Sequence, residues 1–472
     1  MDRKLLVAGQ WVEGIGSAEI RSPYDGRVVS RVAQGGPKDV ERALAAAFAS
    51  RERLSALSTG RRRDVLLGMV DGLQKREAEL AELICDEAGK PIRAARGELK
   101  RAIETFRLAA SELPSFGGRT VPIDLDAASA GYECETRRFP AGVVVGIVPF
   151  NFPLNLGAHK VAPAMAVGAP IIVKPPPQAP SAQLVLAEIA QAAGADPGAL
   201  QVIPCDNAVA EILATDPRVR VLSFTGSARV GWKLKQKAAG KVVLELGGNA
   251  AVVVCPDADL DWAAERCAVG GMTYAGQVCI KVQRIFVEWP VYGAFVERLV
   301  SRVRALQAGD PRDEATVVGP VIDDAAAQRI EAWVQEAVGA GAKLLAGGGS
   351  RKGRVLAPAL LADVPVDAKV SREEAFGPVV VVSPVETFDD ALAAVNDSAY
   401  GLQAGVFTRD LRKARQAFHR LEVGGVIVND YPTYRSDNYP YGGVKGSGLG
   451  REGVRYAMDE MTEERVLVTR SA

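Results

Sequence analysis

A cysteine and a glutamate stand where covalent chemistry could be carried out. Glu245 ends an apolar, strand-like run and is followed by two glycines. A carboxylate in such a place has a raised pKa, which suits a general base. Cys279 follows a helical pattern, and its thiolate could attack an electrophilic carbon. Taken singly, Glu245 is equally consistent with a carboxylate held by backbone amides, and Cys279 with a small core residue.

Three turn segments carry groups that could assist a nucleophile or hold a phosphate. PFNFP at residues 149–153 follows an apolar strand and offers the amide of Asn151 to an oxyanion, although asparagine is also a common turn former. FTGS at residues 224–227 lies where a strand turns into a helix, a place that binds phosphate or serves only close packing. EAFGP at residues 374–378 combines a carboxylate with an aromatic ring and has the same ambiguity.

Two motif matches fail on their context. Gly448, Gly450 and Gly453 satisfy the dinucleotide fingerprint GxGxxG, but the 19 residues that follow Gly453 are too few to complete a βαβ unit. Tyr441 and Lys445 have the YxxxK spacing of short-chain dehydrogenases, but the two glycines between them disfavour the helix that this pair requires. Neither match is used to predict the site.

The composition argues against several classes of protein. The 472 residues carry 57 Lys and Arg against 57 Asp and Glu, so no basic excess suggests a nucleic-acid partner. The longest weakly polar run, residues 161–173, is too short and too often interrupted by proline and glycine to span a membrane. Two histidines and six dispersed cysteines argue against a metal site and a disulfide framework, and the chain is expected in the cytoplasm.

Alternating strands and helices are expected around these residues. Strands are predicted at 143–149, 171–174, 200–203, 219–224 and 242–246, with helices beginning near 154, 181, 207 and 227. This alternation indicates a parallel, doubly wound α/β sheet, which binds ligands at the carboxyl ends of its strands. A helix is also predicted over 64–87, and a second α/β pattern runs from 252 to about 423.

Taken in order, these segments resemble the motifs of the aldehyde dehydrogenase superfamily over essentially the whole chain. The matching segments are PFNFP at 149–153, VKP at 173–175, FTGS at 224–227, LELGGN at 244–249, GQVC at 276–279, EAFGP at 374–378 and GGVKGSG at 442–448. The resemblance implies an α/β fold with a Rossmann-type cofactor domain, an α/β catalytic domain and a small β oligomerisation arm. It assigns residues 1–119, 139–247 and 424–457 to the cofactor-binding domain, 248–423 to the catalytic domain, and 120–138 with 458–472 to the arm.

The resemblance also gives the candidate residues their roles. Cys279 would attack the aldehyde carbon, and Asn151 together with the backbone N–H of Cys279 would hold the oxyanion. Hydride would then pass to the nicotinamide, and Glu245 would activate the water that hydrolyses the resulting thioester. Because family members that transfer the acyl group to coenzyme A typically lack this glutamate, a free carboxylic acid is the expected product. No metal is expected.

The cofactor contacts of the family carry over to further positions. Lys174 would meet the adenosine ribose, Ser227 the pyrophosphate, Glu374 the nicotinamide ribose and Phe376 the nicotinamide end. The other expected contacts are Pro149, Phe150, Gly226, Val230 and Leu246. Pro177 departs from the family, because NAD-preferring members often carry a glutamate there. A proline neither binds a ribose 2′-hydroxyl nor repels a 2′-phosphate, so the cofactor is expected to be NAD or NADP, with NADP tolerated.

The substrate and the partners are less closely defined. The positions that line the substrate funnel of the family include Phe152, Asn155, His159 and Arg435, which suggest a small, polar and anionic aldehyde. Arg435 is equally consistent with a surface loop residue. The arm implies a homodimer or homotetramer. Two alternatives stay open: a catalytically inactive binding or structural protein of the same fold, and a thioester-based acyl transferase or esterase.

Overall fold

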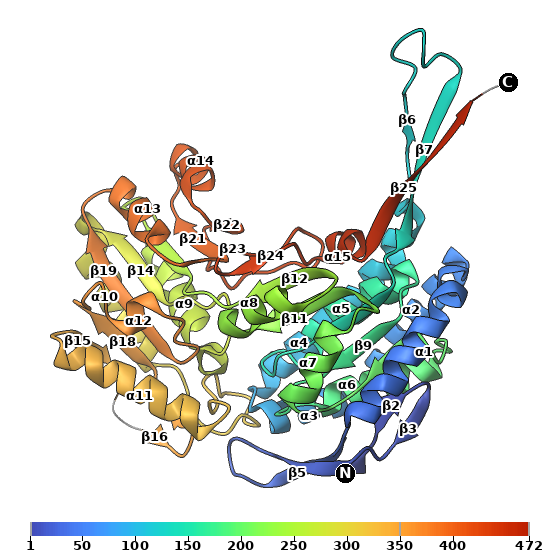
Figure 1. The fold of residues 1–472 in the computed structure, drawn as a ribbon. Coiled ribbons are helices and arrows are strands. Elements are labelled where there is room, and N and C mark those ends of the chain that lie inside the picture. The colour runs from blue at the N-terminus through green and yellow to red at the C-terminus, as the bar shows by residue number, and fades with distance from the viewer. Residues whose placement is uncertain (1, 349–350, 471–472) are drawn as a thin grey trace.

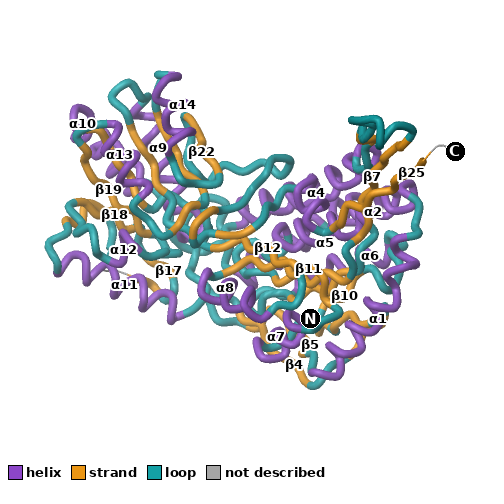
Figure 2. Tube along the Cα trace, turned by 45° about the horizontal axis from the view of Figure 1, so that its top comes forward, coloured by secondary structure: helices purple, strands orange, loops and turns teal. Residues whose placement is uncertain are grey.

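The computed structural model describes residues 2–348 and 351–470, which form two α/β bodies and a projecting arm (Figure 1). Each body is built on a twisted β-sheet. Figure 2 shows strands in the middle of each body and helices on the outside. The bodies meet where the chain passes from the first sheet to the second, close to the residues singled out above.

The first body contains an eight-stranded sheet. In sheet order its strands are β24 (Gly448–Leu449), β12 (Lys241–Leu246), β11 (Val219–Gly226), β8 (Val143–Ile147), β9 (Ile171–Lys174), β10 (Leu200–Val202), β2 (Leu5–Val7) and β3 (Gln10–Val12). The five strands from β12 to β10 run parallel, and β24 and β2 flank them antiparallel. The predicted parallel sheet is therefore confirmed, and the carboxyl ends of β8, β11 and β12 lie on one edge.

Helices cover both faces of this sheet because its strands are apolar on both sides. Val144 and Ile171 pack into one apolar cluster, whereas Val143 and Ile172 pack into another on the opposite face. The helices are α1 (Pro37–Ser55), α2 (Thr59–Lys75), α3 (Glu77–Ala88), α4 (Ile92–Glu112), α5 (Asn155–Val167), α6 (Ser181–Ala192), α7 (Asn207–Thr215), α8 (Ala228–Lys237) and α15 (Val454–Glu460). A 3₁₀ turn spans Leu113–Ser115.

The single helix predicted over residues 64–87 is wrong. The chain leaves helical geometry at Arg76, where φ is −108° and ψ is 22°, so that α2 ends and α3 begins there. Arg76 forms ion pairs with Glu79 at 2.7 Å and with Glu188 of α6 at 2.6 Å. These contacts support the break, and the apolar pattern alone does not reveal it. The predicted end is confirmed, because Gly89 caps α3 with a φ of +65°.

The second body is built on a seven-stranded sheet. Its order is β15 (Lys343–Ala346), β18 (Ala359–Ala362), β19 (Val379–Val385), β14 (Arg284–Glu288), β13 (Ala251–Val254), β21 (Gln403–Phe407) and β22 (Gly425–Val428). Its helices are α9 (Leu260–Met272), α10 (Trp289–Arg304), α11 (Asp324–Gly339), α12 (Lys369–Arg372), α13 (Phe388–Asn396) and α14 (Leu411–Arg420). The predicted boundary before residue 424 needs correction, because β22 pairs with β21 and so belongs to this second sheet.

Besides the arm, three small sheets lie outside the two large ones. They are β1 (Asp2–Arg3) with β5 (Val28–Gln34) and β4 (Gly16–Arg21); β16 (Arg351–Lys352) with β17 (Val355–Leu356); and β20 (Tyr400–Gly401) with β23 (Val444–Lys445). Within the described residues, no helix is both long enough and apolar enough to cross a membrane.

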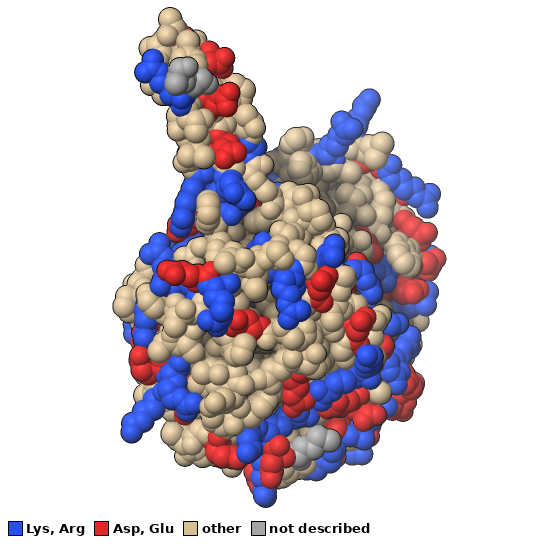
Figure 3. Space-filling model, turned by 90° about the vertical axis from the view of Figure 1, so that its right-hand side faces the viewer, with Lys and Arg blue, Asp and Glu red and all other residues tan. Residues whose placement is uncertain are grey.

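The arm is a three-stranded sheet that stands away from the first body. β7 (Tyr132–Pro140) pairs antiparallel with β6 (Thr120–Val121) on one side and with β25 (Thr462–Arg470) on the other. Figure 3 shows the arm rising from a surface on which Lys and Arg are interspersed with Asp and Glu. Val466, Leu467 and Val468 are 63%, 54% and 50% exposed. Residue 1 of the predicted cofactor domain and residues 471–472 of the predicted arm lie outside the described residues.

Candidate active site

A cavity of about 550 Å³ lies at the carboxyl edge of the first sheet. Its walls come from both bodies, and they include most of the residues that the sequence analysis singles out. The lining residues are Pro149, Phe150, Asn151, Leu156, Thr225, Gly226, Ser227, Arg229, Glu245, Leu246, Gly247, Cys279, Arg329, Trp333, Glu374 and Phe376. The structure therefore brings together residues that are more than a hundred positions apart in the sequence.

A strained turn presents Cys279 to the cavity. After α9 ends at Met272, Tyr274 and Ala275 adopt left-handed backbone conformations with φ of +55° and +52°. Such conformations are costly for residues other than glycine and persist only where the surroundings enforce them. The Tyr274 hydroxyl donates a hydrogen bond of 3.1 Å to the carbonyl of Ala88, and its ring is fully buried. Cys279 follows this turn and is partly exposed.

Gln277 fastens the same turn to its surroundings. Its side-chain amide donates to the carbonyl of Pro320 at 3.2 Å and accepts a hydrogen bond from the N–H of Ile322 at 2.9 Å. The backbone carbonyl of Gln277 accepts a hydrogen bond of 2.9 Å from Nδ2 of Asn151. Asn151 is thereby joined to the cysteine turn and keeps a second N–H hydrogen on Nδ2. The arrangement allows that hydrogen to point at an oxygen formed next to Cys279.

Glu245 is the penultimate residue of strand β12 and is buried. Burial, reinforced by the charge of Glu452, raises the pKa of Glu245 to about 7. Burial and the nearby Glu245 carboxylate also raise the pKa of the Cys279 thiol well above its usual range. At neutral pH Cys279 is therefore a thiol, and the protonation state of each group affects the pKa of the other.

Tyr441 belongs to this site, although the sequence analysis does not predict it there. Its hydroxyl lies 3.5 Å from Cys279 Sγ and donates a hydrogen bond of 3.3 Å to Glu245 Oε1. In the sequence it stands out only through its spacing from Lys445, and that pairing is correctly rejected, because Lys445 is in β23 and no helix joins the two. No local pattern marks Tyr441, since its contacts lie far away in the sequence.

Behind Glu245 lies a buried cluster of ionisable side chains, defined here as Lys160, Arg435, Glu452, His159 and Asp437. Glu452 accepts hydrogen bonds of 3.0 Å from both Lys160 and Arg435. Although burial acts in the opposite direction, these two cations lower the pKa of Glu452 to about 2. His159 Nε2 lies 2.9 Å from a carboxylate oxygen of Asp437. The cluster keeps fixed charges close to Glu245 in a poorly hydrated place.

The cofactor residues predicted from the resemblance fall into two groups. Pro149, Phe150, Gly226, Ser227, Leu246, Glu374 and Phe376 line the cavity. Lys174, Pro177 and Val230 are not among its lining residues in the described part of the chain. Lys174 is buried at the end of β9, Pro177 is exposed in the turn beyond it, and Val230 is 39% exposed on α8.

Two features of the cavity wall depend on particular residue types. Phe376 has a φ of +44°, and its ring meets the ring of Phe150 edge-on with a centroid separation of 5.9 Å. A Cβ at Gly247 would lie 2.1 Å from the Glu374 carboxylate, so any other residue there would displace that carboxylate. Glu374 in turn accepts a hydrogen bond of 3.2 Å from the N–H of Gly248. Burial raises its pKa to about 7.

The four predicted substrate residues lie beside the cavity, and none is among its lining residues in the described chain. Phe152 is partly buried, with the Lys90 ammonium 3.4 Å from its ring centre. Asn155 and His159 are each 1% exposed, and Asn155 Nδ2 is without a hydrogen-bond partner. The Arg435 side chain is 6% exposed. The alternative that Arg435 is a surface loop residue is therefore wrong.

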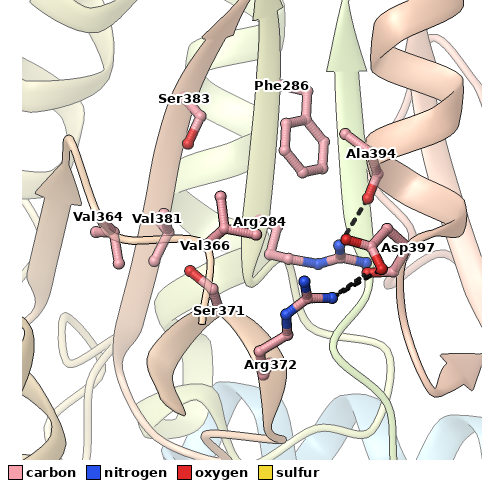
Figure 4. Close-up of a pocket in the computed structure, with 10 residues that line it drawn as sticks. All are labelled: Arg284, Phe286, Val364, Val366, Ser371, Arg372, Val381, Ser383, Ala394 and Asp397. Atoms are coloured by element: carbon pink, nitrogen blue, oxygen red, sulfur yellow. Dashed lines mark hydrogen bonds and ion pairs between the residues drawn. The ribbon is translucent and has the colours of Figure 1, made fainter. Parts of the chain in front are cut away.

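A second pocket lies on the other body, over β14 and β19, and two arginines line it (Figure 4). Arg284 donates hydrogen bonds to the carbonyls of Asn249, Ala394 and Val395 at 3.1, 3.0 and 3.2 Å. Arg372 pairs with Asp397 at 2.9 Å. These guanidinium groups already bind the protein, and their contacts tie α13 to β14. Among the described residues, no group of three His, Cys, Asp or Glu side chains is placed to hold a metal ion.

Comparison with known proteins identifies the family. The family model described as the aldehyde dehydrogenase family matches residues 11–467. The 3-sulfolactaldehyde dehydrogenase of Priestia aryabhattai is 42% identical over 466 residues, which are 98% of this chain and 97% of that protein. Aldehyde dehydrogenase 21 of Physcomitrella patens, solved with its reaction product succinate, is 43% identical with a TM-score of 0.97, covering 99% of this chain and 98% of that one.

A further solved structure extends the likeness. The NADP-dependent glyceraldehyde-3-phosphate dehydrogenase of Bacillus halodurans, solved with NADP, is 34% identical with a TM-score of 0.97 over 100% of both chains. These findings confirm the predicted fold class and the prediction of an enzyme that oxidises aldehydes with NAD or NADP. The chain belongs to the aldehyde dehydrogenase family.

Proposed function

We propose that this aldehyde dehydrogenase oxidises a small, polar and anionic aldehyde to the free carboxylic acid, with Cys279 as nucleophile, Asn151 as oxyanion donor and Glu245 as general base. The observation that carries the proposal is the convergence of these three side chains on one cavity of about 550 Å³. The resemblance supplies their roles, and the geometry is compatible with each of them.

The chemistry begins at the sulfur of Cys279. The thiolate adds to the aldehyde carbon, and the carbonyl oxygen of the aldehyde becomes an oxyanion. The free Nδ2 hydrogen of Asn151 and the backbone N–H of Cys279 are the proposed donors to this oxyanion. Because Asn151 is already fixed to Gln277 and is 3% exposed, its amide needs little reorganisation when the charge forms.

The cavity suits a nicotinamide dinucleotide. Helix α8 begins after Ser227, whose side chain makes no capping hydrogen bond, and no acidic residue lies in its first turn. The helix N-terminus, with the exposed cation of Arg229 beside it, can therefore accept a phosphate group. Glycine at position 247 leaves room beside the Glu374 carboxylate, which is the proposed ribose ligand. When bound, the cofactor supplies the acceptor for the hydride that leaves the substrate carbon.

Hydrolysis completes the proposed cycle. Glu245 takes a proton from a water molecule, which attacks the thioester on Cys279 and releases the carboxylic acid. Product analysis with and without coenzyme A tests this step, and the expected product is the free acid at an unchanged rate in both cases. Formation of an acyl-coenzyme A instead would support the alternative of acyl transfer.

The proposed substrate class carries a negative charge. The enzymes named above act on, or hold, molecules with a sulfonate, a carboxylate or a phosphate. In this chain the three cations Lys160, Arg435 and Arg101 pair with the two carboxylates Glu452 and Asp437 in the buried region behind Glu245. This excess of positive charge favours an anionic substrate.

We expect succinic semialdehyde to be oxidised with a kcat/KM at least about tenfold above that of butyraldehyde, because only the former carries a carboxylate on the same carbon chain. Steady-state reduction of the cofactor with the two aldehydes measures this ratio. 2-Hydroxypropanal and its 3-sulfonate derivative form a second matched pair of neutral and anionic aldehydes. Equal values within both pairs would contradict an anionic substrate and leave the dehydrogenase activity itself in place.

The proposed cofactor choice depends on Pro177. A proline in the exposed turn after β9 offers no carboxylate to bind a ribose 2′-hydroxyl or to repel a 2′-phosphate. We expect comparable kcat/KM values with NAD and NADP, and we expect Pro177→Glu to weaken NADP use by about tenfold or more through charge repulsion. Dissociation constants from protein fluorescence provide a readout that is independent of turnover. Pro177→Gln adds a side chain of the same size without charge and should keep NADP binding; a hundredfold preference of the unaltered enzyme for NAD would contradict the proposal.

The arm supports a proposal about assembly. In the described arm β25 is an edge strand, and its exposed apolar side chains would be buried by a second copy of the chain. We expect a homodimer or homotetramer in sedimentation, and we expect Val466→Asp combined with Val468→Asp to shift it towards a monomer. A monomer of the unaltered protein would contradict this.

The six cysteines are free, which supports a location in the reducing cytoplasm.

A further inference from the structure

The position of Tyr441 between the nucleophile and the base is not explained by packing alone. Its ring is 1% exposed, and its hydroxyl faces both Cys279 Sγ at 3.5 Å and Glu245 Oε1 at 3.3 Å. Its backbone is paired with that of Glu452, with N–H donation in both directions, at 2.9 and 2.6 Å. The Arg435 guanidinium lies 3.7 Å from the ring centre on the face of the ring. The hydroxyl is therefore fixed in place from three sides.

We propose that the Tyr441 hydroxyl carries the proton of the Cys279 thiol to the Glu245 carboxylate and thereby generates the nucleophilic thiolate. The inference rests on the proposed roles of Cys279 and Glu245, and it adds a residue and a route to them. A hydroxyl group can accept one hydrogen bond while it donates another, which is the requirement for a relay. The thiol donates to the phenolic oxygen, and the phenolic O–H donates to Glu245 Oε1.

The step balances without any further reactant. The S–H bond breaks, and its proton forms a new O–H bond at Tyr441, while the original phenolic proton moves to Glu245. The electron pair of the S–H bond stays on sulfur. Tyr441 is a neutral phenol before and after the step, and one negative charge has moved from the carboxylate to the sulfur. The new phenolic hydrogen can then donate to the thiolate and stabilise it.

Burial raises the pKa of all three groups, and the thiol holds its proton more tightly than Glu245 does, so the exchange supplies the thiolate as a minor species. Burial raises the pKa of Glu245 to about 7, which makes the carboxylate a better proton acceptor. Once Glu245 is protonated, its charge no longer opposes the thiolate of Cys279. Burial also raises the pKa of Tyr441 well above its usual range, so the phenol passes a proton on and does not remain ionised.

Alkylation of Cys279 tests the relay without any aldehyde or cofactor. We expect Tyr441→Phe, which keeps the ring and removes only the hydroxyl, to slow the reaction with iodoacetamide at neutral pH by about tenfold or more. Glu245→Gln should slow it to a similar extent. The double variant should be no slower than the slower single variant, because both residues act in one route. The modified Cys279 peptide is followed by mass spectrometry over the neutral and alkaline range.

The pH dependence separates a relay from a packing effect. At alkaline pH hydroxide removes the thiol proton directly, so the rates of Tyr441→Phe and the unaltered protein should converge there. Tyr439→Phe is the matched control, since its hydroxyl bonds Gln403 Oε1 at 3.2 Å and not the cysteine, and it should react at the unaltered rate. Cys279→Ser gives the background from the other cysteines.

Several results would overturn the relay. One such result is an alkylation rate of Tyr441→Phe at neutral pH that lies within about twofold of the rate of the unaltered protein. Another is a slower alkylation of Tyr441→Phe that persists at alkaline pH. Additive losses in the double variant would show that the two residues act separately. The proposed function is tested by aldehyde oxidation, so its failure would be recognised while the alkylation result still stood.

Discussion

Replacement of Cys279 by alanine is expected to lower kcat for aldehyde oxidation by at least about 10⁴-fold, which is the loss typical when a covalent nucleophile is removed. Without the sulfur no thiohemiacetal forms, and neither the oxyanion donor nor the general base can replace a missing bond to the substrate carbon. The absorbance of the reduced nicotinamide measures the loss. Binding of NADP, measured by protein fluorescence, should change little, because the substitution shortens the side chain of only one of the sixteen residues that line the cavity.

The control for this prediction is another cysteine of the same body. Cys267 is fully buried in α9 and lies in the apolar core, and burial raises the pKa of its thiol. Cys267→Ala should lower stability by about 1–2 kcal/mol through lost packing while kcat stays within about twofold. If Cys279→Ala keeps more than about one hundredth of the activity, the nucleophile is a different group and the covalent mechanism fails.

The part of the fold around the cavity could be predicted because local patterns determine it. The five parallel strands β8 to β12 are short apolar runs bounded by turns. Their alternation with helices indicates a parallel sheet, and this inference does not depend on the identity of any single residue. The break at Arg76 could not be predicted in this way. It depends on an ion pair with Glu188, which lies 112 positions further along the chain. The boundary at β22 likewise depends on pairing with β21.

The residues of the candidate site likewise fall into those that local sequence patterns predict and those that depend on distant contacts. Asn151, Glu245 and Cys279 stand in motifs whose residue types can be recognised in the sequence, and the structure brings them to one cavity. Tyr441 and the buried charges have no such mark. The His159–Asp437 pair joins residues 278 positions apart, and Tyr441 meets Glu245 across 196 positions. Sequence patterns identify residues that are unusual where they stand, whereas these residues become unusual only through their neighbours.

Replacement of Glu245 by glutamine is expected to lower kcat by about 10²–10³-fold, the range for removal of a general base. Glutamine has the same shape and can still accept a hydrogen bond from Tyr441, but it cannot take a proton from water. The first turnover should therefore still yield one equivalent of reduced cofactor per site. After it, the acyl group should accumulate on Cys279, where mass spectrometry after acid quenching detects it.

The pH dependence follows from the raised pKa of Glu245. Burial and the charge of Glu452 raise that pKa to about 7, so Glu245 is protonated and inactive as a base below this pH. Hydrolysis of the acyl-enzyme should thus become faster as the pH rises through about 7 and level off above it. In Glu245→Gln this inflection should be absent, since the group that titrates has been removed.

Glu87 offers a matched control, because it is also a fully buried carboxylate whose pKa is raised by burial. It accepts hydrogen bonds from the hydroxyls of Ser30 and Ser181 at 2.6 and 2.5 Å and is not among the residues that line the cavity in the described chain. Glu87→Gln should leave both the rate and its pH inflection unchanged. An inflection that survives in Glu245→Gln, or an acyl-enzyme that does not accumulate there, would assign the base to another residue. Agreement with both expectations would assign the titration to Glu245, the carboxylate that accepts a hydrogen bond from Tyr441.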